Sequence, residues 1–144
     1  MSKRADRLTI RAARREERLA LEDLQRRASL ALPDYRAELE ANPDAIHLPA
    51  EHLAETLVAE DGGQVVGFAV VLESELDGLF VEPSRWRQGI GAALIDAAVH
   101  HARRRGLSMS VIASPSARGF YERCGFSVEG EEATRFGPAL RMSR

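Results

Sequence analysis

A strand, a glycine-containing turn and a long helix follow one another in the middle of the chain, and this unit constrains the fold most. The strand, residues 75–81, ends before Pro83, and residues 89–105 repeat apolar side chains at helical spacing. The expected buried face of the helix comprises Ile90, Leu94, Ala97, Ala98 and His101. Three arginines followed by Gly106 suit the C-terminus of a helix. A strand that leads into such a helix indicates a mixed α/β domain.

The rest of the sequence predicts further strands and helices on both sides of this unit. Asp61, Gly62 and Gly63 form a tight-turn signal between two strand-like segments. The apolar positions of the first helix are Leu19, Ala20, Leu24 and Ala28. The expected elements are strand 8–11, helices 14–29 and 33–40, a loop or short helix at 42–52, strands 56–60, 64–72 and 107–113, helix 115–124, and strands 126–130 and 133–142. The order β-α-α-β-β-β-α-β-α-β-β describes one domain over residues 1–144, with its core at about residues 8–142.

Composition excludes several classes of protein. A chain of 144 residues is long enough to bury one core. No apolar run approaches the roughly 18 residues of a membrane span, and the charged start lacks an apolar signal core. Cys124 is the single cysteine, which excludes an internal disulfide and suits a reducing compartment. We therefore expect a cytoplasmic protein with no membrane partner.

Charge is distributed unevenly along the chain. Residues 37–84 hold eleven Asp and Glu and no Lys or Arg, whereas both flanking regions are rich in arginine. Such a pattern can indicate two binding surfaces of opposite sign, or only charges that solvate exposed faces. The sequence leaves both interpretations open.

Metal and nucleic-acid binding are not expected. The four histidines (His47, His52, His100 and His101) lack the spacing of metal ligands. Arginines 103–105 are better explained as a solvated helix end, because the chain is acidic overall and lacks interleaved aromatic residues.

The turn before the long helix has the chemistry of an anion site. It reads Arg87-Gln88-Gly89-Ile90-Gly91-Ala92. Glycines let the backbone approach a ligand, and the N–H groups at the start of a helix favour an anion. The residues alone allow either a phosphate site or a plain tight turn. A dinucleotide fingerprint would need a third glycine where Leu94 stands, and the Gly-Lys-Ser/Thr of a nucleotide P-loop is absent.

Two separated motifs resemble those of the GNAT (Gcn5-related N-acetyltransferase) superfamily. The first is Val81-Glu82-Pro83 followed by Trp86-Arg87-Gln88-Gly89-Ile90-Gly91, and the second is Ala117-Arg118-Gly119-Phe120-Tyr121-Glu122-Arg123-Cys124-Gly125-Phe126. The resemblance covers about residues 8–142. It implies the GNAT acyl-CoA N-acyltransferase fold, acetyl-CoA as the cosubstrate and an amine as the acceptor. Trp86 stands where the family often has Arg or Gln, and Ser114 where an Asn commonly contacts the pantetheine arm.

The resemblance also implies which residues bind the cosubstrate. Backbone N–H groups of the strand would hold the pantetheine and the oxyanion, and these residues are Leu79, Phe80 and Val81. The pyrophosphate would be held by Arg87, Gln88, Gly89, Ile90, Gly91 and Ala92. Ser114 and Tyr121 complete the expected set.

Transfer of an acetyl group to an amine needs a base and benefits from an acid. A lysine-like amine, with a pKa of about 10.4, must lose a proton, which a carboxylate can accept. Glu75 is the candidate base, with Asp77 or a water chain as alternatives. Strand alternation would place Glu75 and Asp77 on the face of Leu79 and Val81, but the family usually has a bulge here, which would break the alternation.

Tyr121 is the candidate acid. Its phenol can hydrogen-bond to the departing sulfur. The alternative is that Tyr121 packs with Phe120 and Phe126 in the core. Sequence chemistry alone favours the core, and the resemblance favours the sulfur partner.

The sequence therefore predicts an N-acetyltransferase that moves acetyl from acetyl-CoA to a primary amine. The acidic middle of the chain suggests a cationic acceptor, such as a polyamine-like molecule or a basic peptide end. A non-catalytic acyl-CoA sensor and a nucleotide-binding regulator are the rival hypotheses. A homodimer through the last strands, at residues 134–142, is a further expectation.

Overall fold

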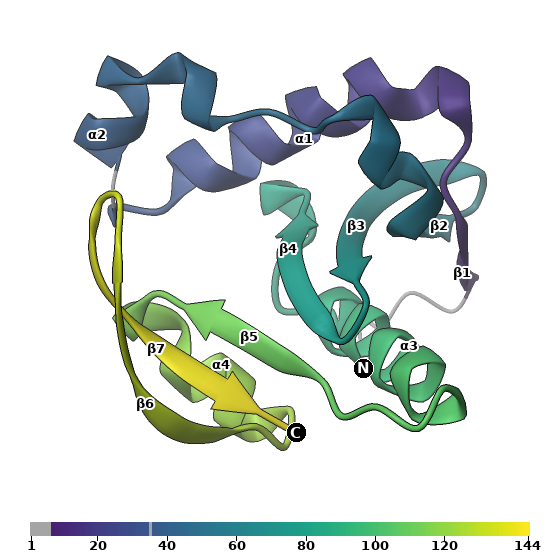
Figure 1. The fold of residues 1–144 in the computed structure, drawn as a ribbon. Coiled ribbons are helices and arrows are strands. Elements are labelled where there is room, and N and C mark those ends of the chain that lie inside the picture. Colours follow the sequence, from purple (N-terminus) through teal and green to yellow (C-terminus); the bar gives the residue numbers. More distant parts are fainter. Residues whose placement is uncertain (1–6, 35) are drawn as a thin grey trace.

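The computed structural model describes residues 7–34 and 36–144 and shows a seven-stranded sheet with helices on its faces (Figure 1). The strand order is β1-β2-β3-β4-β5-β7-β6, and every neighbouring pair is antiparallel except β4 and β5. The strands are β1 Leu8–Ala12, β2 Thr56–Asp61, β3 Gln64–Leu72, β4 Glu75–Val81, β5 Ser110–Ala113, β6 Ser127–Thr134 and β7 Gly137–Ser143. The α-helices are α1 Arg18–Ala31, α2 Arg36–Ala41, α3 Ile90–Arg104 and α4 Arg118–Arg123. The predicted α/β order is confirmed.

Two hydrophobic clusters fill the space between the sheet and its helices. α1 and α3 lie on opposite sides of the sheet (Figure 1). One cluster joins α1 to the sheet through Leu21, Leu24, Phe68 and Val70, and the other joins α3 and α4 to the sheet through Ile90, Leu94, Val111, Tyr121 and Phe126. The two faces of β4 are therefore covered by different helices.

The buried helix faces differ in part from the predicted ones. In α3 the buried residues are Ile90, Leu94, Ile95, Ala98, Val99 and Ala102, while His101 is exposed and Ala97 is half-buried. In α1 the buried residues are Leu21, Leu24 and Ala28, and Leu19 is 67% exposed. Ala20 is exposed as well. The predicted and observed stripes share Ile90, Leu94 and Ala98 in α3, and Leu24 and Ala28 in α1.

Turn chemistry explains which strand boundaries were predicted correctly. Gly62 and Gly63 have φ values of 60° and 86°, and Asp61 pairs with Gln64 across the turn. This is the two-residue hairpin that Asp-Gly-Gly predicted. The last hairpin was placed wrongly, because Gly130 follows a bulge at Glu129 and does not end β6. β6 continues to Thr134, which pairs with Gly137.

The end of α3 explains why the fifth strand is shorter than the predicted residues 107–113. Gly106 has a φ of 75°, and the N–H of Leu107 donates to the carbonyl of Ala102. Bonds of this kind close a helix C-terminus around a left-handed glycine. Leu107 therefore completes the helix cap, and β5 begins only at Ser110.

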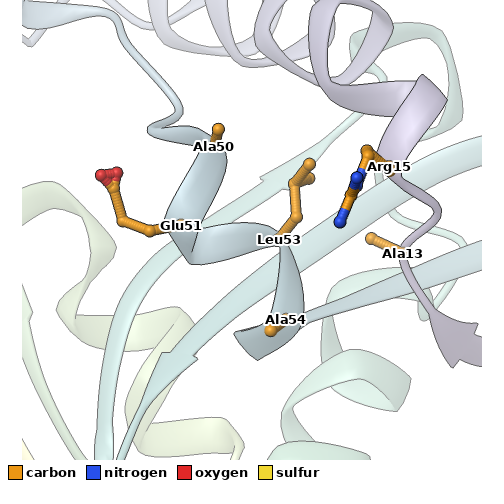
Figure 2. A pocket seen from close by; sticks show the side chains of 6 residues that line it. All are labelled: Ala13, Arg15, Ala50, Glu51, Leu53 and Ala54. Atoms are coloured by element: carbon orange, nitrogen blue, oxygen red, sulfur yellow. The ribbon is translucent and has the colours of Figure 1, made fainter.

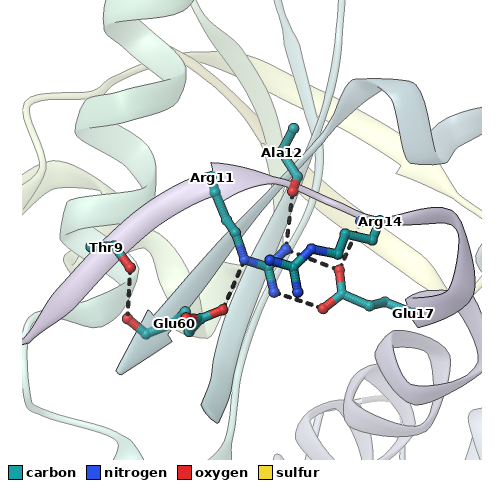
Figure 3. A network of polar contacts seen from close by, with 6 residues as sticks. All are labelled: Thr9, Arg11, Ala12, Arg14, Glu17 and Glu60. Atoms are coloured by element: carbon teal, nitrogen blue, oxygen red, sulfur yellow. Dashed lines mark hydrogen bonds and ion pairs between the residues drawn. The ribbon is translucent and has the colours of Figure 1, made fainter. Parts of the chain in front are cut away.

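A polar network fastens the first strand to the helix that follows it (Figure 3). Arg11 donates from both terminal nitrogens to the carboxylate of Glu17, at 3.0 and 2.7 Å, and from Nε to Glu60 at 2.9 Å. The backbone N–H of Arg14 donates to Glu17 at 2.7 Å. These bonds hold the pKa of Glu17 below its usual value. They join β1, β2 and the start of α1.

Candidate active site

β4 and β5 separate soon after they meet. Their pairing covers only Glu75 with Ser110 and Leu76 with Val111. Beyond these residues β5 remains paired with β7, and β4 with β3. We call the part of β4 and β5 beyond Leu76 and Val111 the β4–β5 divergence. It breaks the sheet in its middle, next to the start of α3.

Backbone groups of β4 point into this divergence. The N–H of Glu82 donates to the carbonyl of Val66, so it points toward β3. Because successive backbone groups alternate in direction along a strand, those of Leu79 and Val81 point to the β5 side. A second observation agrees, since the carbonyl of Val81 accepts a hydrogen bond from the indole N–H of Trp86 at 2.8 Å. The N–H groups of Leu79 and Val81 lie beyond the β4–β5 ladder.

A bulge in β4 decides which side chains share a face. The register skips one residue between Val70–Gly78 and Val71–Leu76, which leaves Asp77 without an opposite partner. Leu79 and Val81 pack on the α3 side. Glu75 lies opposite Leu72, which packs on the α1 side. The alternation that would place Glu75 with Leu79 is therefore broken, as the resemblance indicated.

The start of α3 presents unpaired backbone donors. Gly89 precedes the helix with a φ of 82°, and no side chain caps this end. The first helical bond runs from the N–H of Ala93 to the carbonyl of Gly89, so the N–H groups of residues 90–92 have no partner within the helix. A Cβ at Gly91 would lie 3.1 Å from the ring of Phe120, so close packing also favours glycine there. These donors suit a phosphate.

The loop before α3 is held by side chains on both sides. Arg85 donates from Nε to the Oε1 of Gln88 at 2.9 Å, and from Nη2 to Asp61 at 2.5 Å. Trp86 is bonded to Val81, so its N–H is directed at β4. Arg87 has a φ of 66°, a conformation that costs a residue with a side chain roughly 1–2 kcal/mol. The two braces therefore stabilise a strained loop.

Tyr121 packs in the hydrophobic cluster that also contains Ile90, Leu79 and Val81. The side chain is 8% exposed, and its ring makes edge contacts with Phe120 and Phe126 at centroid distances of 5.1 and 5.5 Å. The ring of Tyr121 therefore belongs to the core, and its role as the sulfur partner stays a prediction. The hydroxyl has no hydrogen-bond partner among the described residues. Every side-chain oxygen that is fully buried among those residues does have a hydrogen-bond partner, so the Tyr121 hydroxyl is not fully buried. The hydroxyl must therefore reach solvent. Burial raises the pKa of Tyr121 above 10, so the phenol keeps its proton.

The candidate base lies on the other side of the sheet from Tyr121. Glu75 and Asp77 are both exposed, and no hydrogen bond joins either side chain to a described residue. Tyr121 packs in the cluster on the α3 side. A group that passes through the β4–β5 divergence could contact Tyr121 on one side and Glu75 on the other.

Hydrogen bonds and an ion pair connect residues on both sides of α2 to the part of the sheet formed by β5, β6 and β7. Ser114 follows β5 directly, and its hydroxyl lies 3.5 Å from that of Ser116, which is bonded to Asp34 in the α1–α2 connection. Arg135, in the β6–β7 turn, contacts Asp44 at 3.5 Å and Asn42 at 3.2 Å. Figure 1 shows this turn reaching α2. The stretch around α2 therefore contacts both the residues after β5, through Asp34, and the β6–β7 turn, through Asn42 and Asp44.

A separate pocket of about 630 Å³ lies between the β1–α1 connection and residues Ala50–Glu55 (Figure 2). Its lining residues are Ala13, Arg15, Ala50, Glu51, Leu53 and Ala54. None of them belongs to the expected cosubstrate set. Figure 2 shows the carboxylate of Glu51 directed away from Arg15. This pocket is not part of the candidate site.

Sequence reasoning missed two residues of the site. Arg85 was not singled out, although an arginine three positions before a glutamine in a turn was the available signal. Asp61 was assigned only to the hairpin turn, and its bond to Arg85 depends on tertiary contact. Cys124 is half-buried, and burial raises the pKa of its thiol.

Comparisons with known proteins agree with this geometry. Residues 18–126 match the family model described as Acetyltransferase (GNAT) family. The peptidyl-lysine N-acetyltransferase YjaB of Salmonella typhimurium is 35% identical over 100 residues, which cover 67% of this chain and 63% of that protein. The chain spans less than two thirds of the length of the curated relatives it matches.

Solved structures share the fold over nearly the whole chain. Apo YjaB of Escherichia coli superposes with a TM-score of 0.71 at 26% identity, covering 94% of this chain and 96% of that one. The PaiA N-acetyltransferase of Thermoplasma acidophilum, solved with coenzyme A, has a TM-score of 0.74 at 16% identity, covering 95% and 98%.

The chain belongs to the GNAT acetyltransferase family, whose cosubstrate is acetyl-CoA. The observed groups fit that molecule, because the N–H donors at the start of α3 suit a diphosphate and the N–H groups of β4 beyond its ladder with β5 suit an amide arm. No described helix is both long and apolar enough to cross a membrane.

Proposed function

We propose that the chain transfers the acetyl group of acetyl-CoA to a primary amine by direct attack. The observation that supports this proposal is the β4–β5 divergence, where N–H groups of β4 lie outside the β4–β5 ladder next to the open start of α3. Tyr121 packs in the same hydrophobic cluster as Leu79, Val81 and Ile90, which supports its inclusion in the site. Residues 87–92 hold the diphosphate, and Leu79 and Val81 hold the pantetheine arm. Ser114, at the end of β5, faces the same arm with one hydroxyl.

The roles of the side chains follow from the bonds that change. The amine nitrogen bonds to the acetyl carbon and loses a proton, while the carbon–sulfur bond breaks and the thiolate leaves. A strand N–H at Leu79 or Val81 stabilises the oxyanion between these steps. Tyr121 donates a hydrogen bond to the sulfur as negative charge develops on it. Its raised pKa makes it a persistent donor more than a strong acid.

The base is proposed to be Glu75, which accepts the proton of the amine. Its exposed carboxylate lies on the α1 side, from which an acceptor would approach. Asp77 lies at the bulge nearby, and it or a bound water remains an alternative. Glu75→Gln should lower kcat at neutral pH and shift activity to higher pH, where the amine loses its proton to solvent. An equal loss with Asp77→Asn and none with Glu75→Gln would assign the base to Asp77.

The acceptor is proposed to be a cation, and a lysine side chain in a peptide is one candidate. The name of the Salmonella relative, a peptidyl-lysine N-acetyltransferase, supports that candidate. The acids proposed to meet the acceptor are Glu38, Glu40, Asp44 and Glu51. The side chain of Asp44 is paired with Arg135, so it contributes less than the others. Combined neutralisation of Glu38, Glu40 and Glu51 should raise the KM of a cationic acceptor more than Asp44→Asn does.

A screen for thiol release from acetyl-CoA tests the activity. Small polyamines, aminoglycoside-like amines and lysine peptides would be offered in turn, and each hit confirmed by mass spectrometry of the product. Binding of acetyl-CoA with no thiol released by any amine would favour the sensor. Absence of coenzyme A binding would refute the assignment of residues 87–92.

Pairing through the last strands remains a proposal. β7 is paired on both sides, so the accessible edge belongs to β6. That strand carries Glu129, Glu131 and Glu132 and a bulge, features that disfavour pairing between two copies. Analytical ultracentrifugation would decide between a monomer and a dimer.

A further inference from the structure

Arg85 connects the phosphate loop to a distant hairpin. It ends the short turn Pro83–Arg85 that follows β4, and its side chain is only 24% exposed although it carries a charge. Its guanidinium donates to the Oε1 of Gln88 at 2.9 Å and to the carboxylate of Asp61 at 2.5 Å. Asp61 is the last residue of β2 and is 17% exposed. Arg85 is therefore fixed between two partners.

The bond to Arg85 determines how the amide of Gln88 is oriented. A guanidinium has donors only, so it must face the carbonyl oxygen of the amide and not the NH₂. The NH₂ group of Gln88 is then directed away from Arg85, and no described residue accepts its hydrogens. These two donors belong to a loop that leads into the open start of α3. The reversed amide would present an oxygen instead, which would repel an anion.

The same bond spans the strained part of the loop. Arg87 and Gly89 are both in the left-handed region, with φ values of 66° and 82°. Arg87 lies between Arg85 and Gln88 in the chain. The hydrogen bond between these two side chains therefore favours the loop conformation in which the N–H groups at the start of α3 are exposed. Asp61 neutralises Arg85 and limits its movement toward a phosphate. Arg85 is thus suited to act on the anion through Gln88.

We propose that Arg85 is a positioning residue for the diphosphate of acetyl-CoA. It holds the Gln88 amide with its NH₂ group toward the diphosphate, and Asp61 holds Arg85 in place. This inference rests on the proposed function, because it assumes that residues 87–92 bind the diphosphate.

A double-mutant cycle tests whether Arg85 acts through Gln88. Coenzyme A affinity would be measured by calorimetry for the wild type, Arg85→Met, Gln88→Leu and the double variant. Trp86, the only tryptophan, is 36% exposed beside the loop and offers a fluorescence readout. Each single change should weaken binding about tenfold, the effect of one hydrogen bond to a charged group. The double variant should bind within about threefold of the weaker single variant.

If the affinity losses of the two single variants multiply in the double variant, the proposal is overturned, because Arg85 would then contact the phosphate independently of Gln88. Pantetheine, which lacks the diphosphate, separates positioning from general damage. Arg85→Met should weaken coenzyme A at least fivefold more than pantetheine, measured by NMR titration. Equal losses for both ligands would show a structural defect and refute the proposal.

A second variant covers the case in which Arg85→Met does not fold. Gln88→Glu keeps a partner for Arg85 but removes the donors and adds a negative charge. It should weaken coenzyme A more than Gln88→Leu does, and binding within threefold of the wild type would refute the proposal. Arg141→Met is the matched control, because Arg141 pairs with Glu132 on the last hairpin, and should bind as the wild type does. No binding by the wild type would instead refute the proposed function itself.

Discussion

Replacing Tyr121 with phenylalanine removes one oxygen from a well-packed ring. The ring contacts with Phe120 and Phe126 remain, and the hydroxyl has no hydrogen-bond partner among the described residues. Stability should therefore change by less than about 1 kcal/mol. Catalysis should suffer, because the departing sulfur loses its donor. We expect kcat to fall about 100-fold, which corresponds to about 2.7 kcal/mol at the transition state.

The assay is thiol release under saturating acetyl-CoA with the best amine from the screen. Affinity for coenzyme A, measured by calorimetry, should remain within about threefold of the wild type. Tyr121→Leu is the matched variant, since it removes the ring as well. It should lower the free energy of unfolding by about 2–4 kcal/mol, through a cavity and lost aromatic contacts. A kcat for Tyr121→Phe equal to that of the wild type would remove the hydroxyl from the mechanism.

The pKa of Tyr121 adds a second measurement. Burial raises this pKa above the unfolded value of 10.0, so above pH 10 the folded state binds more protons at this site than the unfolded state does. The contribution of Tyr121 to the free energy of unfolding is therefore fully present below pH 10 and is lost as the pH rises through the pKa of the folded state. Urea unfolding should show that the wild type loses more stability than Tyr121→Phe between pH 9 and about 11. Parallel losses would contradict the burial argument.

Two other changes test the loop and the first helix. Gly89→Asp should weaken coenzyme A at least tenfold by calorimetry, because it adds charge at a left-handed position; Gly89→Asn, which keeps the strain without the charge, should lose less. Glu17→Gln should lower the free energy of unfolding by about 1–2 kcal/mol at pH 7, because Arg11 and the N–H of Arg14 lose a charged partner. Since the folded pKa of Glu17 is lowered, its contribution is present above about pH 4.5 and lost as pH falls further, so the gap from the wild type should close in acid.

The sequence predicted the parts of the fold that local chemistry determines. The Asp61-Gly62-Gly63 hairpin and the end of α3 at Gly106 depend on residues that tolerate positive φ, and both were placed correctly. Gly130 shows the limit of that reasoning. A glycine in a strand can mark the end of the strand or a bulge, and only pairing with β7 shows that Gly130 follows a bulge and lies inside β6.

The candidate site was predictable only where a motif lies in one continuous stretch. The glycines before α3 and the Tyr121 helix are such stretches. The β4–β5 divergence is not, because it arises where two strands from separate parts of the chain stop pairing. The contacts of Arg85 with Asp61 and Gln88 likewise connect two residues, Asp61 and Gln88, that are 27 positions apart in the sequence. Contacts of this kind follow from tertiary structure.

The uneven charge of the sequence takes on a different meaning in the fold. Within the described part of the chain, four of the eleven acids in residues 37–84 are paired with arginines from the flanking regions: Glu60 with Arg11, Asp61 with Arg85, Glu82 with Arg27 and Asp44 with Arg135. Two of these pairs brace the end of β4 and the loop before α3, since Glu82 follows β4 and Asp61 holds Arg85. Part of the charge separation along the chain is therefore cancelled by folding, because arginines of the basic ends pair with these four acids. Attraction of a cationic acceptor then depends on the acids that remain unpaired, among them Glu75 beside the β4–β5 divergence.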